Sequence, residues 1–311
     1  MKDGHQYVSI GTLCKWFGLS RQAYYQHEWI LAKDVFQQTL VLEEVKNIRE
    51  RHQRMGVRKL QELLRPFMRE YGIKMGRDVL FDLLSTYGML VRIRKRNVRT
   101  TFSNHWLRKY SNLIIDFIPS KPNELWVSDI TYWKTQNGVL YLHLITDAFS
   151  RKIVGYQVSK TLHGYETIKA LKMALRELRD SLQSHFQLIH HSDRGTQYCS
   201  SSYVNLLNKK QIRISMAQSG DPLENAIAER VNGIIKDEYL LNYQCDNIKD
   251  AEKLLAKSIK LYNNERPHSS IGNLTPQFVH TQYYQISNEK IKRLWKNYYT
   301  KKTIFVNAFQ D

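Results

Sequence analysis

Three apolar runs follow one another closely in the middle of the chain, and they restrict the fold more than any other feature. Residues 124–133, 138–150 and 151–159 are rich in β-branched and aromatic side chains, which is typical of strands. A turn is expected at Phe149 and Ser150, between the second and third runs. The runs therefore predict three antiparallel strands near the start of one domain.

Helical and strand patterns alternate after these strands. Residues 164–180 place Ile168, Leu171, Leu175 and Leu178 on one helical face. We expect strands over 186–191 and 212–217, and helices over 201–209, 222–240, 248–263 and 275–283. Antiparallel strands followed by alternating strands and helices predict an α/β fold, in which helices cover a mixed five-stranded sheet.

The front of the chain has a helical pattern instead. Residues 10–26 contain a short apolar helix, a break at Gly18 and a second helix capped by Ser20, which predicts a helix-turn-helix. Further helices are expected over 40–53, 56–72 and 76–90, with Pro66 kinking or ending the helix of 56–72. A small helical bundle without a DNA-binding role is the alternative interpretation.

Positive charge indicates the kind of partner. The chain has 47 Lys and Arg against 29 Asp and Glu, a net charge of +18, which favours nucleic acid first and an anionic membrane surface second. No stretch approaches the ~18 apolar residues of a membrane span, so we expect a cytosolic protein without a membrane partner. Phosphate contacts are predicted for a basic cluster, with a solvated charge run as the alternative: Arg92, Arg94, Lys95, Arg96 and Arg99.

Three carboxylates stand in apolar or exposed-turn settings that need an explanation. Asp129 interrupts an apolar strand, and Asp193 lies where a strand ends and a turn begins. A buried acid is costly unless it is paired or binds a cation, although an ion pair or a turn cap is the plainer explanation for Asp129. The third acid is Glu229, in a polar stripe on the helix of 222–240. The alternative explanation of this stripe is an ordinary solvated helix face. Its members are Asn225, Glu229, Asn232 and Lys236.

Two acids on the sheet and one on a helix facing it can meet at one point. Their mutual repulsion would raise a pKa, and a divalent cation would remove the conflict. Ligands that are all oxygen suit Mg²⁺ or Mn²⁺, and two such ions about 4 Å apart can activate a water or a hydroxyl at a phosphodiester. The carboxylates therefore predict metal-dependent chemistry on nucleic acid.

Other polar residues are given structural roles. Asp147 is expected to be a hairpin acid, and Glu238 is expected to be a surface charge. Of His190 and His191, one is expected to pack beneath the strand end, and neither is assigned as a metal ligand. Three widely separated cysteines without paired Cys/His spacing indicate neither a disulfide framework nor a zinc site: Cys14, Cys199 and Cys245.

The order Asp129, Asp193, Glu229 resembles the DDE triad of transposases and retroviral integrases. Thirty-five residues separate Asp193 from Glu229, and Lys236 matches a basic residue common in that group. The segments "HSDRGTQY", "SGDPLENAIAERVNGIIKDE" and "YNNERPHSSIGNLTP" closely resemble the larger, orfB-type product of the insertion-sequence-three family. The resemblance extends from "GVRKLQELL" to about residue 280, with modest departures at 223–224 and 231–232.

This resemblance implies a ribonuclease-H-like core with two Mg²⁺ or Mn²⁺ ions, nicking at the 3′ ends of an element, and strand transfer by the freed 3′-hydroxyl. Asp129 and Asp193 would share one metal, and Glu229 would hold the other side of the second. Double-stranded DNA, as element ends and as target, is the expected partner of a homo-oligomer, with an upstream helix-turn-helix product as a further partner. Additional DNA contacts are predicted for Arg194, Asn225 and Lys236.

The role of the "YNNERPHSS" motif stays open at this point. For Arg266 and His268, packing against the core and contact with DNA are equally good explanations. The segments expected along the chain are a helix-turn-helix (1–30), a helical DNA-binding domain (31–98), a basic linker (99–120), the catalytic core (121–283) and a basic tail (284–311).

Three other functions were weighed against an active transposase. A catalytically silent DNA-binding regulator is disfavoured by the intact triad. A ribonuclease H or junction resolvase is disfavoured by the basic helical front end and the thirty-five-residue spacing. A retroviral-type integrase would begin with a His/His/Cys/Cys zinc module, and only Cys14 lies in that region.

Overall fold

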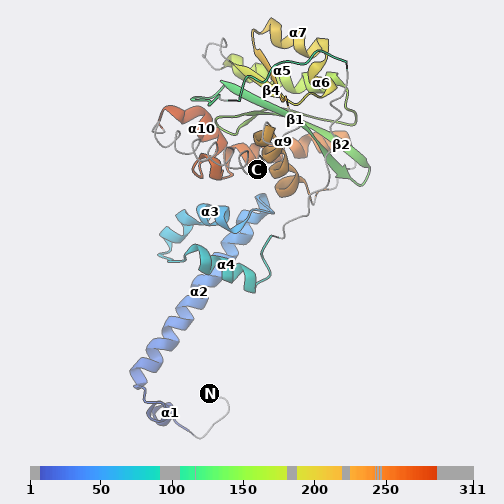
Figure 1. Cartoon of the computed structure of the whole chain (residues 1–311). Helices are drawn as coiled ribbons and strands as arrows, with labels where there is room; N and C mark the ends of the chain where they lie inside the picture. Colours follow the sequence, from blue (N-terminus) through green and yellow to red (C-terminus); the bar gives the residue numbers. More distant parts are fainter. Residues whose placement is uncertain are drawn as a thin grey trace, which may run out of the picture. The chain divides into compact units, whose positions relative to one another are not determined.

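The chain divides into two compact units, each visible in Figure 1. The computed structural model describes residues 8–91, 106–180, 188–218 and 225–285, apart from positions 116, 242, 244 and 246. Met1–Arg51 and Gly56–Val91 form the helical unit, and His52–Met55 and Arg92–Asp311 form the sheet unit. The basic cluster at 92–99 and most of the basic tail lie outside the described residues.

Four helices make up the helical unit: α1 (Ile10–Trp16), α2 (Arg21–Arg51), α3 (Val57–Glu70) and α4 (Arg77–Thr86). The turn between α1 and α2 forms as expected. Gly18 adopts a left-handed conformation with φ of +70°, which glycine tolerates better than other residues. The hydroxyl of Ser20 accepts a hydrogen bond from the amide of Ala23 at 3.0 Å, and so caps α2.

One local prediction for this unit is wrong, and of the two outcomes expected at Pro66 the end of the helix does not occur. The helices expected on either side of residue 30 are one continuous helix of 31 residues, because no glycine or proline interrupts Arg21–Arg51. Pro66 does not end α3, which continues to Glu70. Buried side chains on both sides of the proline, Leu64 and Met68, hold the helix together although its hydrogen-bond ladder lacks one donor.

The sheet unit contains five strands in the order β3-β2-β1-β4-β5. The first three pair antiparallel, and β4 and β5 run parallel to β1. This arrangement confirms the mixed five-stranded sheet. The strands are β1 (Leu125–Thr135), β2 (Gly138–Asp147), β3 (Ile153–Ser159), β4 (Ile189–Ser192) and β5 (Arg213–Met216).

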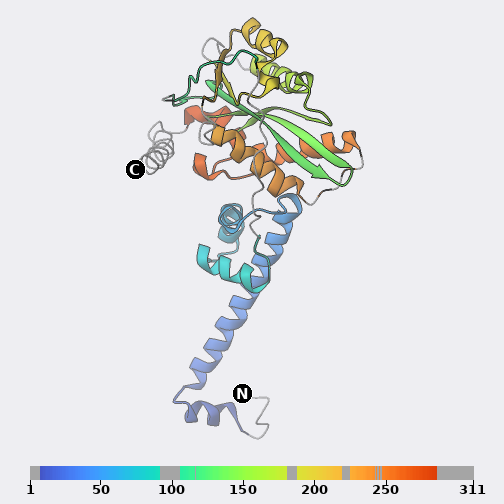
Figure 2. The same cartoon turned by 45° about the vertical axis from the view of Figure 1, so that its right-hand side comes forward.

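Helices cover both faces of the sheet, as the turned view in Figure 2 shows. On one face, α5 (Gly164–Asp180), α6 (Thr196–Cys199) and α7 (Ser201–Lys209) pack with Trp126 and Ile145. On the other face, α8 (Ala226–Ile234), η3 (Ile235–Leu240) and α9 (Ile248–Asn264) pack with Trp133 and Leu144. The chain continues through η4 (Ser269–Ile271) and α10 (Pro276–Gln282) to η5 (Tyr283–Gln285).

The helix expected over 222–240 differs in its second half. It is α-helical only to Ile234 and continues as the π-helix η3 to Leu240. A π-helix has wider turns than an α-helix, so side chains after Ile234 leave the stripe that an α-helix would give. The start expected at Asp221 and Pro222 lies outside the described residues.

Candidate active site

The strand register places the two aspartates side by side. In the parallel pairing of β1 with β4, the last matched residues are Ser128 and Ser192. Asp129 and Asp193 are the next residues on their respective chains. Parallel register therefore brings two carboxylates that lie far apart in sequence to neighbouring positions at the end of β4.

Asp129 lies in an electrostatic field that disfavours its charged form. Burial, followed by the negative charges of Asp193 and Glu229, raises the pKa of Asp129 to about 7. Two hydrogen bonds act in the opposite direction: the Ile130 amide donates to Oδ1 at 2.9 Å, and Nδ2 of Asn232 donates to Oδ2 at 2.8 Å. Proton uptake by Asp129 therefore relieves the cost of burying a charge and part of its repulsion with Asp193 and Glu229.

Asp193 also organises the turn that follows β4. Its Oδ1 accepts a hydrogen bond from the Gly195 amide at 3.0 Å. A Cβ atom at position 195 would lie 3.0 Å from that same Oδ1 and 3.0 Å from Oε1 of Gln197. Glycine therefore allows the turn to close tightly around the Asp193 carboxylate.

Glu229 lies in the first turn of α8 and is exposed, whereas two other members of its stripe contact β1. Asn225 and Asn232 are both buried, so the solvated-face explanation is wrong for them. Nδ2 of Asn225 donates to the Ser128 carbonyl at 3.0 Å, and Asn232 holds Asp129. These two asparagines attach α8 to β1 on either side of Glu229. The DNA contact expected of Asn225 stays a prediction, although its amide is used inside the protein.

Arg194 and Lys236 flank this group. Arg194 follows Asp193 directly and is partly buried, while Lys236 is partly exposed within η3. The wider turns of η3 change the direction expected for Lys236 relative to Glu229. The DNA contacts of both residues stay predictions.

The donor chemistry of the three acids fits a hard divalent cation. Carboxylate oxygens are the ligands that Mg²⁺ and Mn²⁺ prefer. The pKa of Asp129 is raised by burial and then by the charges of Asp193 and Glu229, and a cation would neutralise those charges. Within the residues that the structure describes, no three His, Cys, Asp or Glu side chains are gathered closely enough to form a metal site by themselves. The match of the three acids to a metal therefore rests on their donor atoms and charge, and not on a cluster already formed in the described residues.

His190 packs beneath the strand end, as expected. Its Nε2 lies 2.8 Å from the Ser128 hydroxyl and 2.9 Å from the Tyr203 hydroxyl. Burial, with a smaller contribution from His191, lowers the pKa of His190 to about 3, so the ring is neutral. His191 is buried too, with Nδ1 2.8 Å from the Ser215 hydroxyl. Both rings join neighbouring elements below the aspartates.

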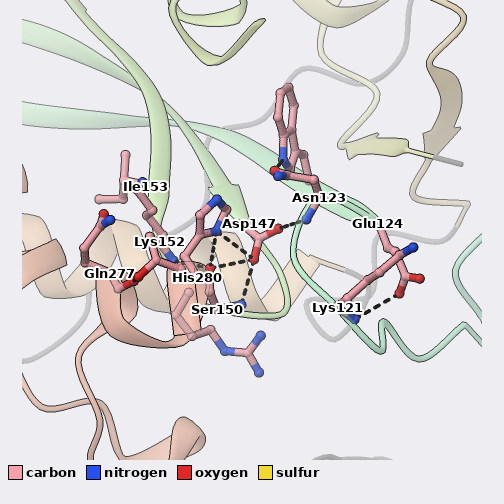
Figure 3. A network of polar contacts seen from close by, with 12 residues as sticks. Lys121, Asn123, Glu124, Asp147, Ser150, Lys152, Ile153, Gln277 and His280 are labelled. Carbon is pink, nitrogen blue, oxygen red and sulfur yellow. Dashed lines mark hydrogen bonds and ion pairs between the residues drawn. The ribbon is translucent and has the colours of Figure 1, made fainter. Parts of the chain in front are cut away.

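Asp147 belongs to a separate polar network, shown in Figure 3. It accepts hydrogen bonds from the amide and hydroxyl of Ser150, at 2.7 and 2.6 Å, and from the Asn123 amide at 2.7 Å. Burial acts to raise the pKa of Asp147, but the interactions with His280 and Ser150 outweigh it and hold the pKa below its usual value. The prediction of a structural hairpin acid is confirmed.

Arg266 also has a structural contact. It is completely buried, and its Nε and Nη2 donate to the two carboxylate oxygens of Glu238 at 2.7 and 2.6 Å. His268 is buried as well, with Nδ1 2.9 Å from the Ser270 hydroxyl. Core packing is therefore the better of the two explanations for this motif. The prediction that Glu238 is a surface charge is wrong, because it forms this ion pair with Arg266.

The sheet order, the two aspartates at its parallel strands and the glutamate on α8 define an integrase-type core. Residues 119–222 and 210–276 each match a family described as integrase core domain. The ribonuclease-H-like fold expected from the sequence is thereby confirmed. Among the described residues, no helix is long and apolar enough to cross a membrane.

Curated relatives identify the family within this class. The chain is 36% identical to the insertion element IS600 uncharacterized 31 kDa protein of Shigella sonnei, over 88% of this chain and 100% of that protein. It is 32% identical to the transposase for IS629 of Shigella sonnei, over 78% and 79%. It is 28% identical to transposase InsF for IS3A of Escherichia coli K12, over 86% and 93%. The chain belongs to the insertion-sequence transposases of the DDE transposase and integrase superfamily, and is a DNA transposase.

Proposed function

We propose that Asp129, Asp193 and Glu229 are the catalytic carboxylates with which this transposase cuts the ends of its element and joins them to new DNA. The supporting observation is geometric: Asp129 and Asp193 lie next to each other at paired parallel strands, and Asn225 and Asn232 hold the helix of Glu229 against β1. Burial of Asp129, followed by the charges of Asp193 and Glu229, raises the pKa of Asp129 to about 7. Acids that repel one another are typical of functional sites, where a bound cation balances their charge. Phosphodiester chemistry uses metal ions held by such acids.

The proposed metals are two Mg²⁺ or Mn²⁺ ions held by these three carboxylates. When bound, they would supply Lewis-acid activation of a water or a 3′-hydroxyl and stabilise the leaving oxygen at the phosphodiester. Asp129 and Asp193 present oxygens from adjacent strands, and Glu229 presents its oxygens from α8. Asn232 orients the Asp129 carboxylate through its bond to Oδ2, and Asn225 holds the start of α8 against β1.

The proposed substrate is double-stranded DNA, as element ends and as target. The net charge of +18 supports this, because basic proteins bind polyanions by releasing counterions. The segment 31–98 is proposed to bind the ends, with the helix-turn-helix segment 1–30 in front of it. The segment 121–283 is proposed to catalyse, and 99–120 and 284–311 to serve as basic linker and tail. Phosphate contacts are assigned to a basic set: Arg92, Arg94, Lys95, Arg96, Arg99, Arg194 and Lys236.

Two protein partners are also proposed. Transposition joins two element ends, so the active form on DNA would be a homo-oligomer. An upstream helix-turn-helix product of the same element is the second proposed partner.

A nicking assay tests the catalytic assignment. Purified protein would be mixed with labelled DNA that carries the sequences flanking its gene, with Mg²⁺ or Mn²⁺, and with the upstream product where the element encodes one. We expect discrete, metal-dependent cuts that free 3′-hydroxyls. Asp129→Asn, Asp193→Asn and Glu229→Gln should each abolish cutting and spare DNA binding, since each removes one anionic ligand and little volume. Full cutting by any of the three variants would remove that residue from the site.

A further inference from the structure

One half of α2 exposes a large apolar surface. Its C-terminal half is buried through Val41, Leu42, Val45 and Ile48, and α2 packs there against α3. The N-terminal half presents Trp29 with 66% of its surface exposed and Phe36 with 62%. An unsupported helix of this length is marginal in water, since packing of an apolar face supplies most of the stability of a helix. The exposed apolar set on α1, the α1–α2 turn and α2 is Trp16, Phe17, Leu19, Tyr25, Trp29, Ile30, Leu31, Val35 and Phe36.

Four positions along α2 have the spacing of a coiled-coil seam. Tyr25, Trp29, Ala32 and Phe36 follow one another at intervals of four, three and four, and so form one stripe along α2. In heptad terms, Trp29 and Phe36 occupy a positions, and Tyr25 and Ala32 occupy d positions. Leu31 and Val35 widen the stripe on one side.

The charge of this half-helix disfavours DNA as its partner. From Arg21 to Leu40, two basic residues, Arg21 and Lys33, are balanced by Glu28 and Asp34. The segment is therefore neutral within a chain of net charge +18. A phosphate backbone is bound by positive charge, whereas a neutral apolar stripe is suited to another apolar protein surface.

The charged residues beside the stripe are complementary between two copies of the helix. Glu28 occupies a g position and Lys33 the e position that follows. In a parallel two-stranded coiled coil, each g residue lies opposite that e residue of the other helix. Two copies of α2 would thus form the Glu28–Lys33 pair twice, once on each side of the seam. Within one helix the two residues are five apart and do not face each other.

The exposed area is sufficient for a dimer. Whole aromatic side chains present roughly 150–250 Å² each, so five half-exposed ones contribute on the order of 500–600 Å². The exposed side chains of Leu19, Leu31 and Val35 add to this area, so the total approaches the ~800 Å² that each partner buries in a stable complex. Ile30 lies at a b position and is not counted.

We infer that the N-terminal half of α2 forms a parallel coiled coil with the same segment of a second copy of this chain, aided by the apolar residues of α1 and its turn. The pairing specifies the surface behind the homo-oligomer of the proposed function. It exists without DNA, so it can be measured independently of cleavage.

Sedimentation equilibrium of the purified full chain without DNA tests the pairing. We expect a dimer at micromolar concentration, and a monomer when Trp29→Gln and Phe36→Gln are combined, because glutamine preserves helix propensity and removes the seam. Phe81→Gln, at an exposed phenylalanine of α4, is the matched control and should leave the dimer intact. A monomeric wild type, or a dimer that survives the paired substitution, would overturn the inference.

Charge reversal separates a second copy from any other partner surface. Glu28→Lys or Lys33→Glu alone should weaken the dimer by roughly two- to tenfold, since each creates two like-charge contacts across the seam. Combining both changes in one chain should restore it, because the pairs re-form with their signs exchanged. Failure of the double variant to recover would exclude the parallel self-pairing.

Discussion

At the scale of single residues, the proposed active site includes a side chain that positions one of the acids. Asn232 is the example: it is buried, and its amide holds one oxygen of Asp129 at 2.8 Å. In the sequence alone, Asn232 is one member of a polar stripe. The structure makes it the link between the helix that carries Glu229 and the strand that carries Asp129.

Replacing Asn232 by leucine should slow DNA nicking by roughly ten- to a hundredfold, the usual effect of removing a group that orients a metal ligand. Leucine is larger than asparagine but favours a helix, so circular dichroism of the variant would verify that the fold is retained. Single-turnover nicking against Mn²⁺ concentration, together with calorimetric Mn²⁺ binding, would measure it. Asn208→Leu, at an exposed site on α7, is the control. Unchanged Mn²⁺ affinity and rate would show that Asn232 does not orient Asp129.

A second prediction concerns His143, which is buried between the Thr167 hydroxyl at 2.9 Å and the Ser159 hydroxyl at 3.0 Å. Burial lowers the pKa of His143 from 6.5 to about 4. The unfolded chain therefore takes up a proton near pH 6.5 while the folded protein does not. Stability is fully present above that pH and is lost as the pH falls toward 4, by on the order of 3 kcal/mol at most.

The measurement for His143 is the free energy of urea unfolding between pH 7.5 and 4. His143→Gln should be less stable at pH 7.5 but should lose less stability on acidification than the wild type. His190, which also titrates low, is present in both proteins and cancels in the difference. Parallel curves for the two proteins would contradict the assignment.

At the scale of elements, the π-helix η3 is held by an ion pair between distant segments. Glu238 lies in η3, and Arg266 follows α9, so their contact fixes the helix that begins near Glu229. Breaking a buried pair on one side leaves an uncompensated charge, whereas replacing both partners leaves none.

Arg266→Met should therefore lower the free energy of unfolding by about 3–5 kcal/mol. The double variant Arg266→Met with Glu238→Gln should recover a large part of that loss. Urea unfolding of the full chain, monitored by circular dichroism, would measure both. If the double variant is as unstable as the single one, the lost interaction is packing of the arginine side chain and not its charge pair.

At the scale of the whole molecule, positive charge is unevenly distributed. The basic cluster at 92–99 lies between the helical and the α/β patterns of the sequence, while the apolar half of α2 is neutral. We therefore expect the two regions to have different partners, with phosphates at the cluster and a second copy at the helix.

Changing Arg94, Lys95 and Arg96 to glutamine should flatten the dependence of DNA affinity on salt by roughly 0.9 log units per log of salt for each lost phosphate contact. Changing Lys249, Lys253 and Lys257, exposed on α9, removes the same net charge and serves as the control. Affinity titrations at several salt concentrations give both slopes. Equal slopes in the two variants would remove the cluster from the interface.

The sequence by itself determined most of the elements and the family, and it supplied the residues to which we assign the chemistry. Helical periodicity predicted α5, and runs of β-branched and aromatic residues predicted the strands, because both signals lie within short stretches of the chain. It failed for α2, where nothing breaks a helix that the pattern divided, and for η3, whose wider turns have no simple periodic signature.

The tertiary structure alone decided how those residues are held. Asn232 and Asp129 are 103 positions apart, Ser150 and His280 are 130 apart, and Arg266 and Glu238 are 28 apart. The register of the sheet and the packing of helices on it determine which of these distant residues come into contact. Local propensity extends over only a few residues, so these contacts leave no pattern in the sequence that a periodicity could reveal.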